Sequence, residues 1–187
     1  VPGPGDPSGT FAGGAFTTDL SRELTGYNAL TFWAKSSVAT TLDVAGLGND
    51  NTGTSKYEAS VTAVPVTTAW TKIIVPIPDA AKLAAEQGLF FFAEGIKNGA
   101  PHTLWFDDVK FENLPTITNP RPALATKPVG TFVGADVVLN GTTTIFSVEG
   151  AERTVGHMAG YFNFSSTNTS VATIVNGGIH VVGAGST

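Results

Sequence analysis

Two adjacent carboxylates, Asp107 and Asp108, stand inside a strand-like segment that is otherwise aromatic and β-branched, TLWFDDVKFENL at residues 103–114. Successive side chains of a strand point to opposite faces, so the alternation that makes Val109 and Phe111 core residues also turns Asp107 inward. An unpaired buried carboxylate is costly, and a hard cation that prefers oxygen ligands, such as Ca²⁺, would remove that cost. Asp107 is therefore a candidate metal ligand. The alternative is a bulge or a strand end that turns both acids to solvent.

Catalysis by a pair of carboxylates requires two acids from different elements, about 5–9.5 Å apart. Asp107 and Asp108 are neighbours on opposite faces of one strand, so they cannot flank one glycosidic bond. Acids that could share a sheet face elsewhere are Asp43, Glu58 and Glu94. No G-x-S-x-G, phosphate-binding or dinucleotide motif occurs, and the three histidines lack the spacing of a zinc site. We expect no enzymatic activity, with a glycoside hydrolase as the less favoured alternative.

Outward aromatic residues suggest a surface on which sugar rings could stack. If Leu30, Phe32 and Ala34 face the core, Trp33 faces the other way. The same alternation turns side chains of residues 40–48 and 89–95 outward, which would form one platform of rings flanked by acids. A candidate histidine also lies at a strand end, where binding loops gather. The candidate ligand-binding residues are Trp33, Asp43, Phe92, Glu94 and His102. Alternatively, a loop covers the outward aromatic residues, and a register error of one residue would invert every assignment.

The elements that would position these residues are short strands separated by turns. Six runs before residue 115 have strand character: residues 28–36, 40–48, 57–64, 70–77, 89–95 and 104–112. One helix is expected over residues 79–88, with Asp79 as its N-cap and Gly88 at its C-terminal end. Many strands and almost no helix predict an all-β fold built as a β-sandwich.

Four prolines between residues 114 and 130 predict a linker or an edge strand, because proline cannot donate a hydrogen bond to a neighbouring strand. We place a domain boundary there, dividing the chain into residues 1–114 and 115–187. The charge shifts at the same place: the first part holds 7 Lys/Arg and 12 Asp/Glu, the second 3 of each. The second part contains five strand-like runs where a closed sandwich of this kind has about seven, so it is expected to lack its last strand.

Five stretches, GYNALTFWAKSS, TLDVAGLGND, WTKIIVPIP, GLFFFAEG and TLWFDDVKFE, resemble in that order the strands of bacterial carbohydrate-binding modules. Those modules form a jelly-roll, galactose-binding-like sandwich, and the resemblance covers residues 11–114. They often carry a structural Ca²⁺ beside an Asp at this point of the last strand, which matches Asp107. The C-terminal stretch FSSTNTSVATIVNGGIHVVGAGST resembles the signature of bacterial Ig-like repeats of the intimin/invasin type. Together they imply a non-catalytic polysaccharide-binding region joined to an Ig-like spacer, outside the cell or on a bacterial surface.

Composition narrows the range of partners. The formal net charge of −5 argues against nucleic acid, whose phosphates require clustered Lys and Arg. No apolar run approaches the roughly 18 residues of a membrane span, so we expect no membrane insertion. Cysteine is absent, which excludes a disulfide framework and a thiol nucleophile.

Two functions from different classes follow. The first is a polysaccharide-binding module with an Ig-like spacer. The second is a structural subunit of a fibre or surface layer, in which an open sheet edge of the incomplete second domain accepts a strand from another molecule. The Pro/Gly-rich N-terminal segment, residues 1–10, could donate that strand.

Overall fold

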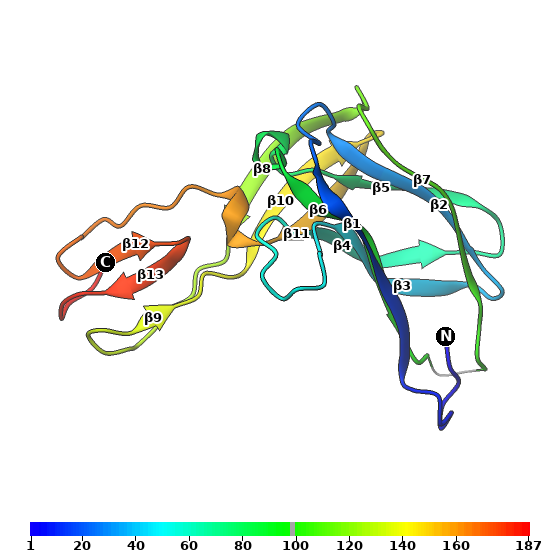
Figure 1. Ribbon diagram of the computed structural model, residues 1–187, viewed down its shortest axis with the longest axis horizontal. Helices are drawn as coiled ribbons and strands as arrows, with labels where there is room; N and C mark the ends of the chain where they lie inside the picture. Colours follow the sequence, from blue (N-terminus) through cyan, green and yellow to red (C-terminus); the bar gives the residue numbers. More distant parts are fainter. Residues whose placement is uncertain (98–99) are drawn as a thin grey trace.

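The structure is a computed structural model that describes residues 1–97 and 100–187, and in that part it is all-β, with thirteen strands and two 3₁₀ turns (Figure 1). The strands are β1 (Phe11–Arg22), β2 (Ala29–Ser36), β3 (Thr40–Leu47), β4 (Ala59–Val66), β5 (Thr71–Pro76), β6 (Glu86–Gly95), β7 (Leu104–Glu112), β8 (Ile117–Leu124), β9 (Asp136–Val137), β10 (Thr142–Val148), β11 (Ala151–His157), β12 (Ala172–Val175) and β13 (Gly178–Val181). The turns are η1 (Ala80–Lys82) and η2 (Ala159–Tyr161). The predicted all-β class is confirmed.

Two antiparallel sheets pack face to face. The larger has seven strands in the order β1-β6-β3-β4-β11-β10-β8, and the smaller has three in the order β5-β2-β7. The apolar core lies between them and draws side chains from both, including Phe32 of β2 and Leu42 of β3, each 0% exposed. This arrangement of layers is consistent with the expected β-sandwich.

The predicted strand phase of residues 28–36 is confirmed. Leu30, Phe32 and Ala34 are buried at 0–1% exposure, whereas Trp33 is 37% exposed. The ring of Phe32 packs on Phe90 of β6 in the opposite sheet and on Phe106 of the neighbouring strand β7, with centroids 5.0 and 5.9 Å away. β2 is therefore the central strand of the smaller sheet, with one face in the core and one face outward.

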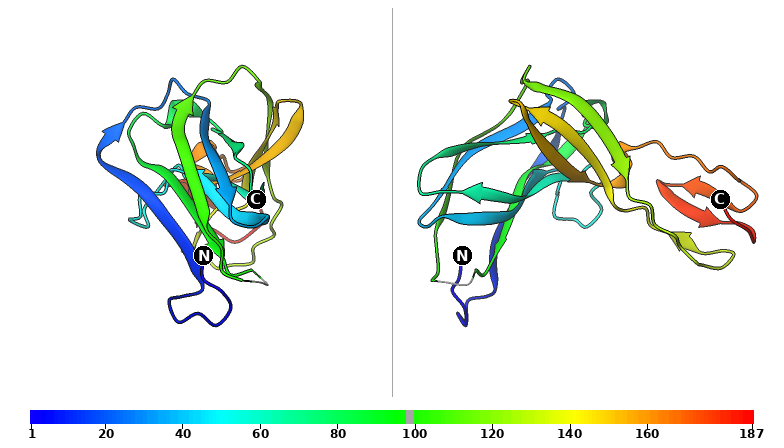
Figure 2. Two further views of the ribbon diagram at one scale, coloured as in Figure 1. Left: turned by 90° about the vertical axis from the view of Figure 1, so that its right-hand side faces the viewer. Right: turned by 180° about the vertical axis from the view of Figure 1, so that it is seen from behind.

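The larger sheet continues past residue 115. β4 and β11 are hydrogen-bonded neighbours, with Ser60 opposite Gly156 and Ala59 opposite His157. The proline-rich segment supplies β8, the last strand of this sheet, which agrees with the edge-strand interpretation of its prolines. The third sheet, β12-β13-β9, lies beyond the C-terminal end of β8 and is visible as a separate arm in Figures 1 and 2. Residues 115–187 thus contribute to two sheets.

The prediction of a helix over residues 79–88 is wrong beyond the first turn. Asp79 does act as an N-cap, because its Oδ1 accepts the Ala81 N–H at 3.1 Å, but the turn ends at Lys82 and β6 begins at Glu86. An isolated helix of this length is marginal, and the apolar residues that follow gain more by pairing with β1 and β3. No helix in residues 1–97 or 100–187 is long and apolar enough to cross a membrane.

His157 lies where β10 and β11 meet the η2 turn, and its environment predicts a pH effect. The rings of Tyr161 and Phe162 lie 5.2 and 4.8 Å from its imidazole, and Thr144 Oγ1 lies 3.1 Å from Nε2. Burial lowers the pKa of His157 below its usual 6.5, more than the hydrogen bond to the Met158 carbonyl raises it.

As pH falls, His157 takes up a proton in the unfolded chain before it does so in the folded protein. Protonation of His157 should therefore lower the stability as pH falls from about 6.5 through the lowered folded-state pKa, and should have no effect well above pH 6.5. Urea unfolding at pH 7.5, 6.5 and 5.0 is expected to show a larger loss of stability for the wild type than for His157→Gln. An equal loss in both proteins would contradict the prediction.

Candidate functional site

The three tryptophans of the chain lie on the outer face of the sheet β5-β2-β7. Trp33 is in β2, Trp105 is in β7, and Trp70 directly precedes β5. Their exposed fractions are 37%, 42% and 41%. The face also carries charged side chains, and we name the whole surface the tryptophan face. Its members are Trp33, Lys35, Trp70, Lys72, Trp105 and Asp107.

The strand register arranges these side chains in two rows. In the first row Lys35 is opposite Trp105, and its Nζ lies 4.8 Å from the ring centroid of Trp70 and 5.1 Å from that of Trp105. In the second row Trp33 is flanked by Lys72 of β5 and Asp107 of β7. Residues two apart on a strand are about 7 Å apart, so the rows adjoin. Aromatic and charged side chains therefore alternate over the face.

Ion pairs neutralise most of the charges around this face. Lys72 Nζ lies 2.6 Å from Glu112 Oε1, and this pair with the Thr31 hydroxyl holds the pKa of Glu112 below its usual range. Lys110 Nζ lies 3.0 Å from Asp108 Oδ2. Lys35 differs, since no carboxylate of the described residues lies within 4.0 Å of its ammonium group. Its closest neighbours on the face are two indole rings.

A β-bulge explains the two adjacent acids of β7. The pairing of β2 with β7 shifts register between Thr31 and Trp33, and Asp108 has a φ of +48°. The bulge leaves Asp107 and Asp108 both exposed, so the prediction that Asp107 points inward is wrong. Val109 is 43% exposed instead of buried, whereas Phe111 packs against the core. Of the two interpretations drawn from the sequence, the bulge agrees with the structure.

The residues around Asp107 do not fit a Ca²⁺ site. Calcium takes about six to eight oxygen ligands, but the neighbour of Asp107 across the strand is Trp33, and its Oδ1 accepts the Asp108 N–H at 2.8 Å. The described part of the chain holds no group of three or more Asp, Glu or His side chains arranged to hold a metal.

The left-handed backbone at Asp108 can be tested with a matched pair of variants. A β-branched residue in this conformation costs about 1–2 kcal/mol, whereas glycine adopts it freely. We expect Asp108→Val to be less stable than Asp108→Gly by that amount in urea unfolding. Both variants lose the exposed pair with Lys110, so its contribution cancels. Equal stability would show that the bulge is absent.

The predicted single platform does not form. Trp33 lies on the smaller sheet, whereas Asp43, Phe92 and Glu94 lie on the larger one. Phe92 and Glu94 also point inward, opposite to the prediction: Glu94 is 0% exposed, and the ring of Phe92 packs 4.5 Å from that of Phe106. The run LFFF has no polar residue to mark its outer face, so its phase could not be read from alternation. Phe91 takes the outer position instead and is buried over Gly46, which leaves room for its ring.

Three of the predicted residues, Asp43, Glu94 and His102, do come together, near the first half of β3 and the end of β6. Glu94 accepts the Asp43 N–H at 2.8 Å and the Thr40 hydroxyl at 3.1 Å, and His102 Nε2 lies 3.4 Å from its Oε1. Lys97 pairs with Asp43 and lies 3.6 Å from Glu94. The bond from Lys97, and then that from the Gly95 N–H, lower the pKa of Asp43. Because Glu94 of β6 accepts from the Asp43 N–H of β3, and Asp43 accepts from the Gly95 N–H of β6, this cluster ties the two strands together.

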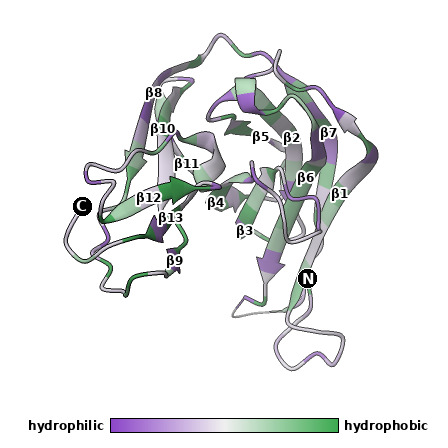
Figure 3. Cartoon of the chain, turned by 60° about the vertical axis from the view of Figure 1, so that its left-hand side comes forward, coloured by the Kyte–Doolittle hydropathy of each residue, from purple (hydrophilic) through white to green (hydrophobic). Residues whose placement is uncertain are grey.

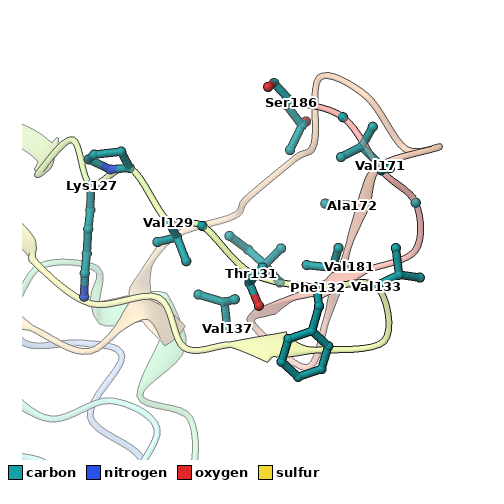
Figure 4. A pocket seen from close by; sticks show the side chains of 17 residues that line it. Lys127, Val129, Thr131, Phe132, Val133, Val137, Val171, Ala172, Val181 and Ser186 are labelled. Atoms are coloured by element: carbon teal, nitrogen blue, oxygen red, sulfur yellow. The ribbon is translucent and has the colours of Figure 1, made fainter.

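The C-terminal sheet forms a second surface feature, an apolar groove of about 770 Å³ (Figure 4). One wall is the segment before β9, where Phe132 is 75% and Val133 is 56% exposed. The other wall includes Ala172 of β12, a strand coloured strongly hydrophobic in Figure 3, and Val181 of β13. Its only charged lining residue in the described part of the chain is Lys127.

The sequence alternation placed Trp33 and Lys35 on one outward face but missed Trp70 and Trp105 as members of the same surface. A signal was present, since each tryptophan is followed two positions later by a charged residue: W-A-K, W-T-K and W-F-D. In a strand this spacing puts the ring and the charge on the same face, which is then exposed to solvent. No protein-family model matches the chain, and no curated protein and no solved structure is significantly similar to it.

Proposed function

We propose that this chain is a non-catalytic, extracellular polysaccharide-binding module that holds its ligand on the tryptophan face. The observation that carries the proposal is the placement of all three tryptophans on one outer sheet face, each 37–42% exposed. Indole rings left partly in water at neighbouring positions of a rigid sheet form an apolar surface with a polar surround, which is typical of an interaction site.

Sugar rings match this surface chemically. Each pyranose has an apolar face of C–H groups that can stack on an indole, and hydroxyls at its edge that hydrogen-bond to charged groups. On the tryptophan face, every ring has such a group beside it: Lys35 between Trp70 and Trp105, and Lys72 and Asp107 beside Trp33. The strands are anchored by core residues on their other side, so the platform is formed before the ligand arrives.

The jelly-roll character of residues 11–114 and the Ig-like character of the C-terminal part belong to this proposal. They are supported by the five N-terminal motifs, by the C-terminal signature and by the two antiparallel sheets that pack face to face. In this proposal the C-terminal part acts as a spacer on the surface of, or in a protein secreted by, a bacterium.

Affinity electrophoresis against a panel of neutral and acidic polysaccharides tests the proposal. We expect at least one polymer to retard the protein and to change the tryptophan fluorescence in solution. Bovine serum albumin in the same gels controls for sieving. Absence of retardation and of any fluorescence change across glucans, mannans, xylans, galactans and uronate polymers would overturn the proposal.

The groove of the C-terminal sheet favours a second candidate function, self-assembly by strand exchange. The groove is apolar, and one of its walls is formed by a three-stranded sheet with free edges. In this alternative, residues 1–10 of another molecule fill it; in this structure they form no strand and are mostly exposed. Filaments that appear with increasing concentration and disappear on deletion of residues 1–10 would support it, and a monomer at every concentration would exclude it.

A further inference from the structure

We infer that the polysaccharide held on the tryptophan face is anionic, and that Lys35 binds a carboxylate or sulfate group on one of its sugar units. This inference rests on the proposed function and adds the chemical class of the ligand. It follows from the charges of the face, from the position of the Lys35 ammonium between two rings, and from the position of Asp107.

Most charged side chains around the tryptophan face are already paired within the protein. The carboxylate of Glu112 is already paired with Lys72, and that of Asp108 with Lys110. These groups offer little net charge to a ligand. Lys35 is the cation of this face for which the described residues provide no carboxylate within 4.0 Å. A positive charge without a protein counter-ion, at the centre of an exposed aromatic surface, is complementary to a negative charge on a ligand.

The Lys35 ammonium has a defined position on the tryptophan face. Nζ of Lys35 lies 4.8 Å from one ring centroid and 5.1 Å from the other, so the charge stands between two indoles. Cation–π attraction to the two rings holds this long, half-buried side chain in place, so the ammonium is positioned before a ligand arrives. An acidic group carried on a sugar ring could then reach Nζ while the ring itself stacks on Trp70 or Trp105.

The protein has a net charge of −5, which repels a polyanion at long range. Salt screens exposed charges beyond about 8 Å under physiological conditions, so the charges within the site decide. Asp107 is exposed beside Trp33, in the row next to Lys35. It would repel an acidic unit on Trp33 but accept hydroxyl hydrogens from a neutral one. The face therefore suits a polymer in which acidic units alternate with neutral ones.

The test compares polymers that differ in charge alone. Glucuronoxylan and the same polymer after chemical reduction of its carboxyl groups have the same backbone and the same faces for stacking. A sulfated galactan and its desulfated form make the second pair, because a lysine ammonium is a point charge that can bind either a carboxylate or a sulfate. We expect the wild type to bind one anionic polymer at least about tenfold more tightly than its neutral form, the effect of one charge-assisted hydrogen bond.

Variants of Lys35 assign that preference to the residue. Lys35→Gln should bring the ratio of affinities to about one, because the amide can still hydrogen-bond to hydroxyls but carries no charge, and Lys35→Arg should keep the preference. Lys56→Gln is the matched control, because Lys56 is exposed and lies in the loop between β3 and β4. Thermal unfolding of each variant verifies that the fold is intact.

Two outcomes overturn the inference while the proposed function stands. In one, the wild type binds both members of each pair equally or binds only neutral polymers. In the other, Lys35→Gln weakens binding to charged and neutral forms alike, which would mean that Lys35 serves only to hold the indoles apart. Binding to no polymer at all would overturn the proposed function and this inference together.

Discussion

Replacing Glu94 with alanine is expected to lower the free energy of unfolding by about 3–5 kcal/mol, the cost of leaving two hydrogen-bond donors without their buried acceptor. Glu94 is 0% exposed and accepts hydrogen bonds from the Asp43 N–H and the Thr40 hydroxyl. Its loss leaves both donors without their acceptor and leaves His102 without the carboxylate that faces it, whereas Lys97 keeps its pair with Asp43. Total stability of a domain is about 5–15 kcal/mol, so this single change removes a large share.

Urea unfolding followed by tryptophan fluorescence measures this effect. Glu94→Gln is the matched variant, because the amide keeps an oxygen acceptor and nearly the same shape while removing the charge. It should fall between the wild type and Glu94→Ala. If Glu94→Ala lost less than about 1 kcal/mol, the typical value of one ordinary hydrogen bond, the cluster would not hold β3 to β6 as described.

The double substitution Trp70→Ala with Trp105→Ala is expected to have the largest effect on ligand binding. It removes both rings of the first row, which stand on either side of Lys35. A well-packed aromatic anchor contributes about 2 kcal/mol or more at an interface, so losing both should cost about 4 kcal/mol and weaken binding by about 1,000-fold or beyond detection. Both side chains are about 40% exposed and lie outside the hydrophobic core, so stability should change little.

Affinity electrophoresis against the polymer that retards the wild type gives the readout. Phe11→Ala is the control, because Phe11 is 64% exposed on β1, in the other sheet. Its loss should leave binding intact. Unchanged binding in the double variant would place the ligand elsewhere, and equal weakening in the Phe11 control would indicate non-specific adsorption to exposed aromatic residues.

The two surface features of the molecule differ in what they offer a partner. The tryptophan face is a flat surface of rings and charges on a sheet whose other side is packed in the core, so it presents its groups in fixed positions. The groove of the C-terminal sheet is apolar and formed largely by valines, alanines and glycines. The first suits hydroxylated and charged ligands, whereas the second suits an apolar strand.

The all-β class, the interior side of β2 and the exposure of Trp33 could be predicted from the sequence by itself. In those segments, polar and apolar side chains alternate clearly, so only one assignment of the two strand faces buries the apolar side chains. The edge position of the proline-rich strand was predictable for the same kind of local reason, since proline has no N–H to donate. The spacing of a charge two residues after each tryptophan also carried information about a shared exposed face.

Only the tertiary structure decided which side chains of β6 face the core and that both acids of β7 are exposed. Phe90, Phe91 and Phe92 follow one another, and packing against Phe106 on one side and over Gly46 on the other settles their phase. The bulge at Asp108 shifts all later residues of β7 by one position, which no periodicity anticipates. Likewise, Trp70, Lys35 and Trp105 meet because three strands pair in one register, and register is a property of contacts between distant segments rather than of any one of them.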